Sequence, residues 1–191
     1  MPLRTIVKVS HISNLSDARY CAGMGVEMIG FQVIPGVDNY ISPEVCQDIR
    51  GWISGPKIIA ELYGLSDPAQ LNGLVETYAP DYFELTWNEY TAFREFLVLP
   101  CLVYYPKASG KPSAEKDEKI GYLLTDENST CNDIEAITAP VLKKISSLRS
   151  LDQALSEACF HGIVLEGPGA LPPGVTNYEQ LGTILEALED G

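Results

Sequence analysis

No stretch of this sequence is apolar over the ~20 residues that a membrane-spanning helix needs. The opening residues, MPLRTIVKV, lack the longer apolar region and the small-residue cleavage site of a secretory signal peptide. They run directly into a segment that is typical of a first strand. These absences predict a soluble cytoplasmic protein that has no membrane partner.

Basic residues are scarce: 13 Lys and Arg stand against 26 Asp and Glu, which gives a formal net charge of −13. Because contacts to nucleic-acid phosphates rely on Lys and Arg, this balance argues against a nucleic-acid partner and against anionic membranes. It also disfavours a phosphorylated ligand, unless a local anion site outweighs the overall field. The alternative is that the acidic residues only form a solvated surface.

Cysteine is present without a pattern. The five cysteines lie far apart, with no C-x-x-C pair and no Cys/His cluster. This spacing argues against a zinc site and a disulfide framework, and we expect reduced, mostly buried thiols. The sequence also lacks G-x-G-x-x-G and P-loop patterns. We expect no metal and no cofactor. The cysteines are Cys21, Cys46, Cys101, Cys131 and Cys159.

Apolar residues make up 46% of the chain, and short β-rich runs alternate with helical segments. Eight such units favour an α/β fold, a (β/α)8 TIM barrel in one domain over 1–191, rather than an open doubly wound sheet. The polar stretch 106–119 predicts a loop where helix 5 is shortened or missing. Strands are expected at 3–9, 28–34, 57–63, 81–86, 98–105, 120–125, 141–145 and 162–165. Helices are expected at 15–24, 42–53, 66–78, 89–96, 132–137, 150–158 and 177–188.

Polar residues at helix starts support these boundaries. Asn14 or Ser16 can cap the first helix, and Ser42 precedes a proline at the start of the second. Asn177, with Gln180 three residues later, predicts a capping box for the last helix.

The first 45 residues carry motifs of a known family. Lys8-Val9-Ser10-His11-Ile12 resembles the pattern K-[IV]-C-G-[IL], and the following residues resemble D-A-x-x-A-x-x-x-G-[AV]-D-x-[IL]-G-F. The segment 37–44, VDNYISPE, is similar to S-P-R-Y-[IV]-S-P-E. These patterns are those of the phosphoribosylanthranilate isomerases of tryptophan biosynthesis. Beyond residue 45 the resemblance rests on element order and on fragments such as YLLTD.

The resemblance implies an Amadori rearrangement of an aminoaldose phosphate to an aminoketose phosphate, which needs a general base and a general acid. The family's catalytic Cys falls on Ser10 and its acid, at the end of strand six, falls on Asp126. A serine hydroxyl has too high a pKa to act alone as a base near neutrality. His11 follows on the strand and would point to the opposite face unless the strand has ended. For Asp126 the alternative is a capping or turn aspartate.

The substrate-binding positions also differ from the family pattern. The family's carboxylate-binding Arg falls on Asn39, and its Q-L-H falls on Glu84-Leu85-Thr86. The glycine-rich phosphate turns are replaced by 127–130 after strand six, by Ser146-Ser147 after strand seven and by Glu166-Gly167-Pro168 after strand eight. The expected site therefore comprises catalytic Asp126 and Ser10, with His11, Asn39, Glu84, Thr86, Ser146, Ser147, Glu166 and Gly167 for substrate.

Four acids fall near predicted strand ends, which predicts a mouth that favours an amine or a cation. The alternative is that they face outward or pair with lysines. Two functions follow: an isomerase or a divergent relative of it, or an inactive barrel that binds a different small ligand or a partner protein. We expect a small-molecule ligand at the C-terminal mouth of a monomer or homodimer. The acids are Glu61, Glu84, Asp126 and Glu166, and the lysines are Lys57, Lys143 and Lys144.

Overall fold

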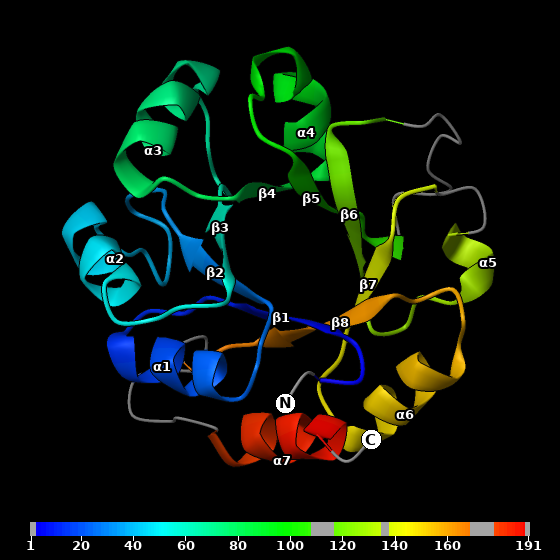
Figure 1. Cartoon of the computed structure of the whole chain (residues 1–191). Coiled ribbons are helices and arrows are strands. Elements are labelled where there is room, and N and C mark those ends of the chain that lie inside the picture. The colour runs from blue at the N-terminus through cyan, green and yellow to red at the C-terminus, as the bar shows by residue number, and fades with distance from the viewer. Residues whose placement is uncertain (1–2, 108–116, 135–137, 169–177, 190–191) are drawn as a thin grey trace.

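Eight parallel strands form a closed barrel in the order of the sequence, as the computed structural model shows (Figure 1). The structure describes residues 3–107, 117–134, 138–168 and 178–189. Strand β8 pairs with β1 and closes the sheet. The predicted (β/α)8 barrel is therefore confirmed, and an open sheet is excluded. The strands are β1 (Ile6–Ser10), β2 (Met28–Gln32), β3 (Lys57–Glu61), β4 (Tyr82–Thr86), β5 (Cys101–Tyr104), β6 (Ile120–Thr125), β7 (Val141–Lys144) and β8 (Gly162–Glu166).

Helices surround the barrel (Figure 1). Of the predicted loop 106–119, residues 108–116 lie outside the described residues, so the loss of a helix there stays a prediction. The helix after β6 is only four residues long, and 135–137 of its predicted range are outside the description. The helices are α1 (Leu15–Gly23), α2 (Pro43–Arg50), α3 (Leu71–Tyr78), α4 (Trp87–Phe93), α5 (Cys131–Ile134), α6 (Leu148–Ser156) and α7 (Tyr178–Glu189), with 3-10 turns η1 (Pro68–Gln70) and η2 (Arg94–Phe96).

The helix starts follow from side-chain caps. Asn14 accepts a hydrogen bond from the Asp17 backbone N–H at 3.0 Å, so Asn14 rather than Ser16 caps α1. Ser42 caps α2 as expected. Asn177 lies outside the described residues, and the Gln180 side chain donates to the Ser146 carbonyl. Gln180 thereby joins α7 to the turn after β7.

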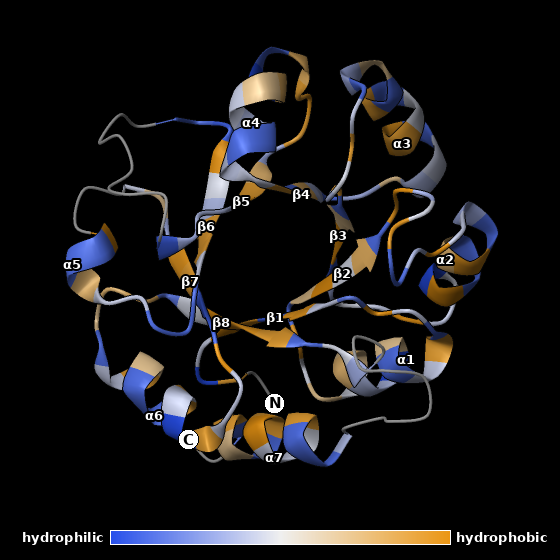
Figure 2. Cartoon of the chain, turned by 180° about the vertical axis from the view of Figure 1, so that it is seen from behind, coloured by the Kyte–Doolittle hydropathy of each residue, from blue (hydrophilic) through white to orange (hydrophobic). Residues whose placement is uncertain are grey.

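The strands alternate between an interior face and a face covered by helices. Inside the barrel, one apolar layer is built from one residue of each of six strands. Between strands and helices lies the larger apolar core, and the helices turn hydrophilic residues outward (Figure 2). The interior layer consists of Met28, Ile59, Leu102, Leu124, Leu142 and Val164. In the part of the chain that the structure describes, no helix is long and apolar enough to cross a membrane.

The expectation of five reduced cysteines was wrong. Cys131 and Cys159 form a disulfide, with their Cα atoms 5.7 Å apart, whereas Cys21, Cys46 and Cys101 are free and buried. The bond joins the start of α5 to the segment before β8, across the intervening strand β7. Glu157 lies beside the two sulfurs, and together they resemble a metal-ligand group. Because the sulfurs are bonded to each other, neither offers a thiolate.

This disulfide predicts a loss of stability on reduction. Its partners are 28 residues apart, and closing such a loop is worth about 3–4 kcal/mol in the chain-entropy treatment. We expect Cys131→Ser and Cys159→Ser to unfold at lower urea concentrations than the wild type, and a reductant to lower the wild-type midpoint to the same extent. Alkylation with mass detection would count three free thiols before reduction. A wild-type midpoint unaffected by reductant would contradict the prediction.

Candidate functional site

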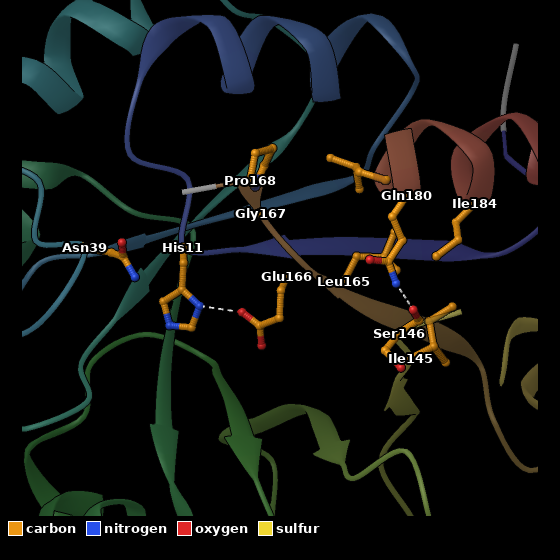
Figure 3. A pocket seen from close by; sticks show the side chains of 11 residues that line it. His11, Asn39, Ile145, Ser146, Leu165, Glu166, Gly167, Pro168, Gln180 and Ile184 are labelled. Carbon is orange, nitrogen blue, oxygen red and sulfur yellow. Dashed lines mark hydrogen bonds and ion pairs between the residues drawn. The ribbon is translucent and has the colours of Figure 1, made fainter. Parts of the chain in front are cut away.

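Two hollows meet at the carboxyl ends of the strands, where barrel enzymes carry their chemistry. The first has a volume of about 380 Å³ and the second about 680 Å³, within the range of small-molecule sites. They share Ile145, Ser146 and Glu166. Figure 3 shows the first hollow, which is lined by His11, Asn39, Ile145, Ser146, Leu165, Glu166, Gly167, Pro168, Gln180, Leu181 and Ile184.

His11 lies at the edge of the first hollow because β1 has already ended at Ser10. Its backbone φ is 54°, in the left-handed region, where a residue with a side chain costs roughly 1–2 kcal/mol. The family pattern has glycine at this position. The ring points to Glu166, and Nδ1 lies 2.6 Å from Glu166 Oε2 (Figure 3). The imidazole therefore faces the mouth, contrary to what strict strand alternation predicts.

The His11–Glu166 pair shifts the pKa values of both groups. Burial lowers the pKa of His11, but the hydrogen bond to Glu166 and the charge of Glu61 outweigh burial and raise it above 6.5. Burial raises the pKa of Glu166, but the His11 contact and the nearby Lys144 lower it to about 2. Lys144 Nζ lies 3.3 Å from Glu166 Oε1. The pair therefore favours an imidazolium beside a carboxylate.

Beneath His11, a lysine and two carboxylates are buried inside the barrel. Lys8 is in register with Met28 and Val164 of the interior layer, so its side chain points inward. Its Nζ lies 2.8 Å from Glu61 Oε1 and 2.6 Å from Glu84 Oε2. All three side chains are nearly inaccessible to solvent. This arrangement satisfies charges that would be very costly to bury alone.

The two carboxylates shift the neighbouring pKa values in the expected directions. Burial lowers the pKa of Lys8, but Glu61 and Glu84 outweigh it and raise the pKa above the usual range. Burial and the charge of Glu61 raise the pKa of Glu84, although Lys8 opposes them. The Tyr63 hydroxyl donates to Glu84 Oε1 at 2.5 Å. Lys8 and Tyr63 were not among the predicted site residues, although a lysine between Val7 and Val9 breaks an otherwise apolar strand.

Of the four predicted acids, three are linked and one is not. Glu61 and Glu84 share Lys8, and His11 contacts both Glu61 and Glu166. Asp126 has other donors: the Tyr104 hydroxyl and, at 2.9 Å, the Lys107 backbone N–H. Asp126 lines the second hollow. The interior acids are thus paired with a lysine of the chain itself.

Ser10 lies at the predicted base position but is only 2% exposed. Its Oγ accepts a hydrogen bond from Lys8 Nζ at 2.5 Å. An ammonium cannot accept a proton, so this contact does not activate the hydroxyl as a base. The geometry gives no support to a catalytic serine.

The turn after β7 is covered by a carboxylate of the turn after β6. Ser146 donates to Glu127 through its backbone N–H at 3.2 Å and its hydroxyl at 2.9 Å. Burial raises the pKa of Glu127, but the Ser150 and Ser146 hydrogen bonds outweigh it and lower the pKa. The Gly167 N–H donates to the Ser10 carbonyl at 2.8 Å. These donors, which an anionic ligand would use, are already occupied by the protein.

Of the other predicted substrate-binding residues, two cap helices and two line the first hollow. Thr86 forms a capping box with Glu89 at the start of α4, and Ser147 caps α6, so both side chains serve helix ends. Asn39 lines the first hollow with a φ of 62°. Gly167 also lines it, and a Cβ there would lie 2.5 Å from the Ser10 carbonyl, which accounts for the glycine by packing.

Comparison with known proteins agrees with this fold. The sequence matches no protein-family model and no curated protein. Among solved structures it is similar to the phosphoribosylanthranilate isomerase from Thermus thermophilus, with 21% identity, a TM-score of 0.75 and coverage of 96% of this chain and 98% of that one. A phosphoribosylanthranilate isomerase in complex with reduced 1-(o-carboxyphenylamino)-1-deoxyribulose 5-phosphate is 13% identical, with a TM-score of 0.73 and coverage of 97% and 98%.

Another similar structure shows monomers generated from the dimeric enzyme from Thermotoga maritima. It is 13% identical and has a TM-score of 0.73, and the alignment covers 98% of this chain and 100% of that one. At these identities the similarity establishes the fold. The similarity in fold covers nearly the whole chain.

The His11–Glu166 pair predicts a pH-dependent contribution to stability. Because the pKa of His11 is raised in the folded protein, His11 adds to the free energy of unfolding. This contribution is fully present below pH 6.5 and is lost as the pH rises through the pKa of His11 in the folded protein. Because the pKa of Glu166 is lowered, Glu166 also adds to the free energy of unfolding. This contribution is present above pH 4.5 and is lost as the pH falls toward about 2. We expect Glu166→Gln to cost about 0.5–1 kcal/mol in urea unfolding at pH 5.5, and less at pH 9. Glu76→Gln, on the surface, is the control. An equal loss of unfolding free energy in Glu166→Gln at pH 5.5 and at pH 9 would contradict the pairing.

The Glu127 contacts predict that removing this carboxylate creates an anion site. In Glu127→Ala the Ser146 hydroxyl loses its acceptor near the start of α6, where the helix dipole favours negative charge, and the Ser146 N–H keeps only its bond to the Ser150 hydroxyl. We expect this variant to bind inorganic phosphate about tenfold more tightly than the wild type in calorimetry. Glu118→Ala, elsewhere on the surface, is the matched loss of one charge. Equal affinities of Glu127→Ala and the wild type would show that Glu127 does not block anions.

Proposed function

We propose that this protein is an acid–base isomerase that acts on a small polar molecule without a phosphate group, bound at the C-terminal mouth of the barrel. His11 is the proton donor and Asp126 the proton acceptor. This is the reverse of the roles that the family resemblance implies, with Asp126 as acid. The observation that carries the proposal is the 2.6 Å His11–Glu166 contact at the wall of a cavity large enough for a small molecule.

The strained backbone of His11 supports a role in the mouth. Residues other than glycine persist in the left-handed backbone conformation only where the surrounding structure holds them, and they often occur at functional sites. The raised pKa of His11 favours the protonated imidazole, which suits a general acid. Asp126 lines the neighbouring hollow, and Glu166 belongs to both hollows, so a ligand that extends through both hollows would contact both groups.

The surroundings favour an uncharged or amine-bearing ligand. The first hollow has apolar walls from Ile145, Leu165 and Ile184 and polar groups at His11 and Asn39. The donors of the β7 turn are covered by Glu127, and Lys144 is paired with Glu166. A phosphate would have to displace a carboxylate of the protein to reach either of them.

A second candidate is the phosphoribosylanthranilate isomerase reaction itself. It is favoured by the similarity to isomerase structures over nearly the whole chain and by Asp126 at the end of β6. It requires His11 or a water molecule to replace the missing cysteine as base, and a phosphate site that the described turns do not offer.

Complementation separates the two candidates. A bacterium that lacks phosphoribosylanthranilate isomerase would receive this gene on medium without tryptophan, and a known isomerase in the same vector is the positive control. We expect no growth, with circular dichroism of the purified protein confirming that it is folded. Growth that is lost in Asp126→Asn would instead establish the second candidate and overturn the first.

Ligand binding tests the proposed site directly. Small polyols, amino sugars and amines would be compared with their phosphorylated counterparts by NMR of the labelled protein. We expect the unphosphorylated compounds to shift the His11 and Asp126 signals, and Glu166→Gln to weaken this binding about tenfold. Binding of the phosphorylated compounds alone would contradict the proposal.

A further inference from the structure

His11 holds an unfavourable backbone conformation, and the contacts that hold it come from inside the barrel. Its backbone N–H donates to the Glu61 carboxylate, at 3.3 Å to Oε1 and 3.2 Å to Oε2. Its ring Nε2 lies 3.6 Å from Glu61 Oε2. One buried carboxylate therefore contacts both the backbone and the ring of His11.

Glu61 reaches His11 across an intervening strand. His11 follows β1, Glu61 ends β3, and β2 lies between them. The path is open because Gly30 of β2 has no side chain: a Cβ there would lie 2.0 Å from Glu61 Oε1 and 3.0 Å from Lys8 Nζ. Glycine at this position makes room for the ion pair beneath the mouth.

Lys8 fixes the orientation of Glu61. The ammonium donates to Glu61 Oε1 at 2.8 Å and also to Ser10 Oγ, the last residue before His11. Every contact that Glu61 makes here is with a donor, which suits a carboxylate. Glu84, the second carboxylate that contacts Lys8, accepts a hydrogen bond from the Tyr63 hydroxyl. Among the described residues, its contacts do not include His11.

We propose that Glu61, held by Lys8, is a positioning residue that fixes the His11 backbone and turns its imidazole toward Glu166. The role in catalysis rests on the proposed function. The effect on His11 is a property of the free protein and is tested without a ligand. Among the residues that the structure describes, four ionisable groups face His11: Lys8 from β1, Glu61 from β3, Tyr63 after β3 and Glu166 from β8, with Lys144 behind Glu166.

The test is an NMR titration of the imidazole signals. The chain has two histidines, so His161→Gln assigns the signals. We expect Glu61→Gln to lower the His11 pKa by about one unit, because the amide keeps an acceptor for the backbone N–H but removes the charge. Glu84→Gln is the matched control, with the same buried substitution on Lys8 but no contact with His11. We expect it to change the His11 pKa by less than about 0.3 units.

Two further measurements keep the proposal testable if Glu61→Gln does not fold. Gly30→Ala should displace Glu61 and lower the His11 pKa in the same direction. In the wild type, the His11 backbone amide should exchange slowly with solvent because it is bonded to a buried carboxylate. An unchanged His11 pKa in folded Glu61→Gln, or an unprotected His11 amide, would overturn the proposal. Neither result depends on whether any substrate is turned over.

Discussion

The buried ammonium of Lys8 is the constraint on which the mouth of this barrel depends. A lone charge inside a barrel is very unfavourable, so Lys8 requires acceptors from neighbouring strands. Glu61 and Glu84 occupy adjacent positions in the β3–β4 register and provide them. Glu61 then binds His11, and His11 binds Glu166. A continuous series of contacts thus links the ion pair in the interior to the side chains at the mouth.

The fold follows from the sequence because alternation of strands and helices is a local signal repeated along the chain. Eight strands were expected, and strand β6 was predicted with the observed bounds. Asn14 and Ser42 marked helix starts because capping depends on residues three positions away. These features need no knowledge of long-range contacts.

The site was harder to predict because its contacts join distant residues. The Lys8–Glu61 pair spans 53 residues, and the partner of Glu127 is Ser146 on the next turn. Nothing local distinguishes Lys8 as a partner for both acids. The face of His11 depended on where the first strand ends, and β1 ends at Ser10, the residue before it. The Cys131–Cys159 disulfide was missed for the same reason, because 28 residues separate its two cysteines in the sequence.

That disulfide also changes how the chain is connected. It closes a covalent ring that contains β7 and α6, about one β/α unit of the barrel. A single backbone cut inside this ring leaves one covalent molecule, since both pieces stay joined through sulfur. The same cut in any other β/α unit would leave two chains held by non-covalent contacts alone. The β7–α6 unit therefore stays covalently joined to the rest of the chain after a single proteolytic cut. This unit carries Ser146, which lies between β7 and α6.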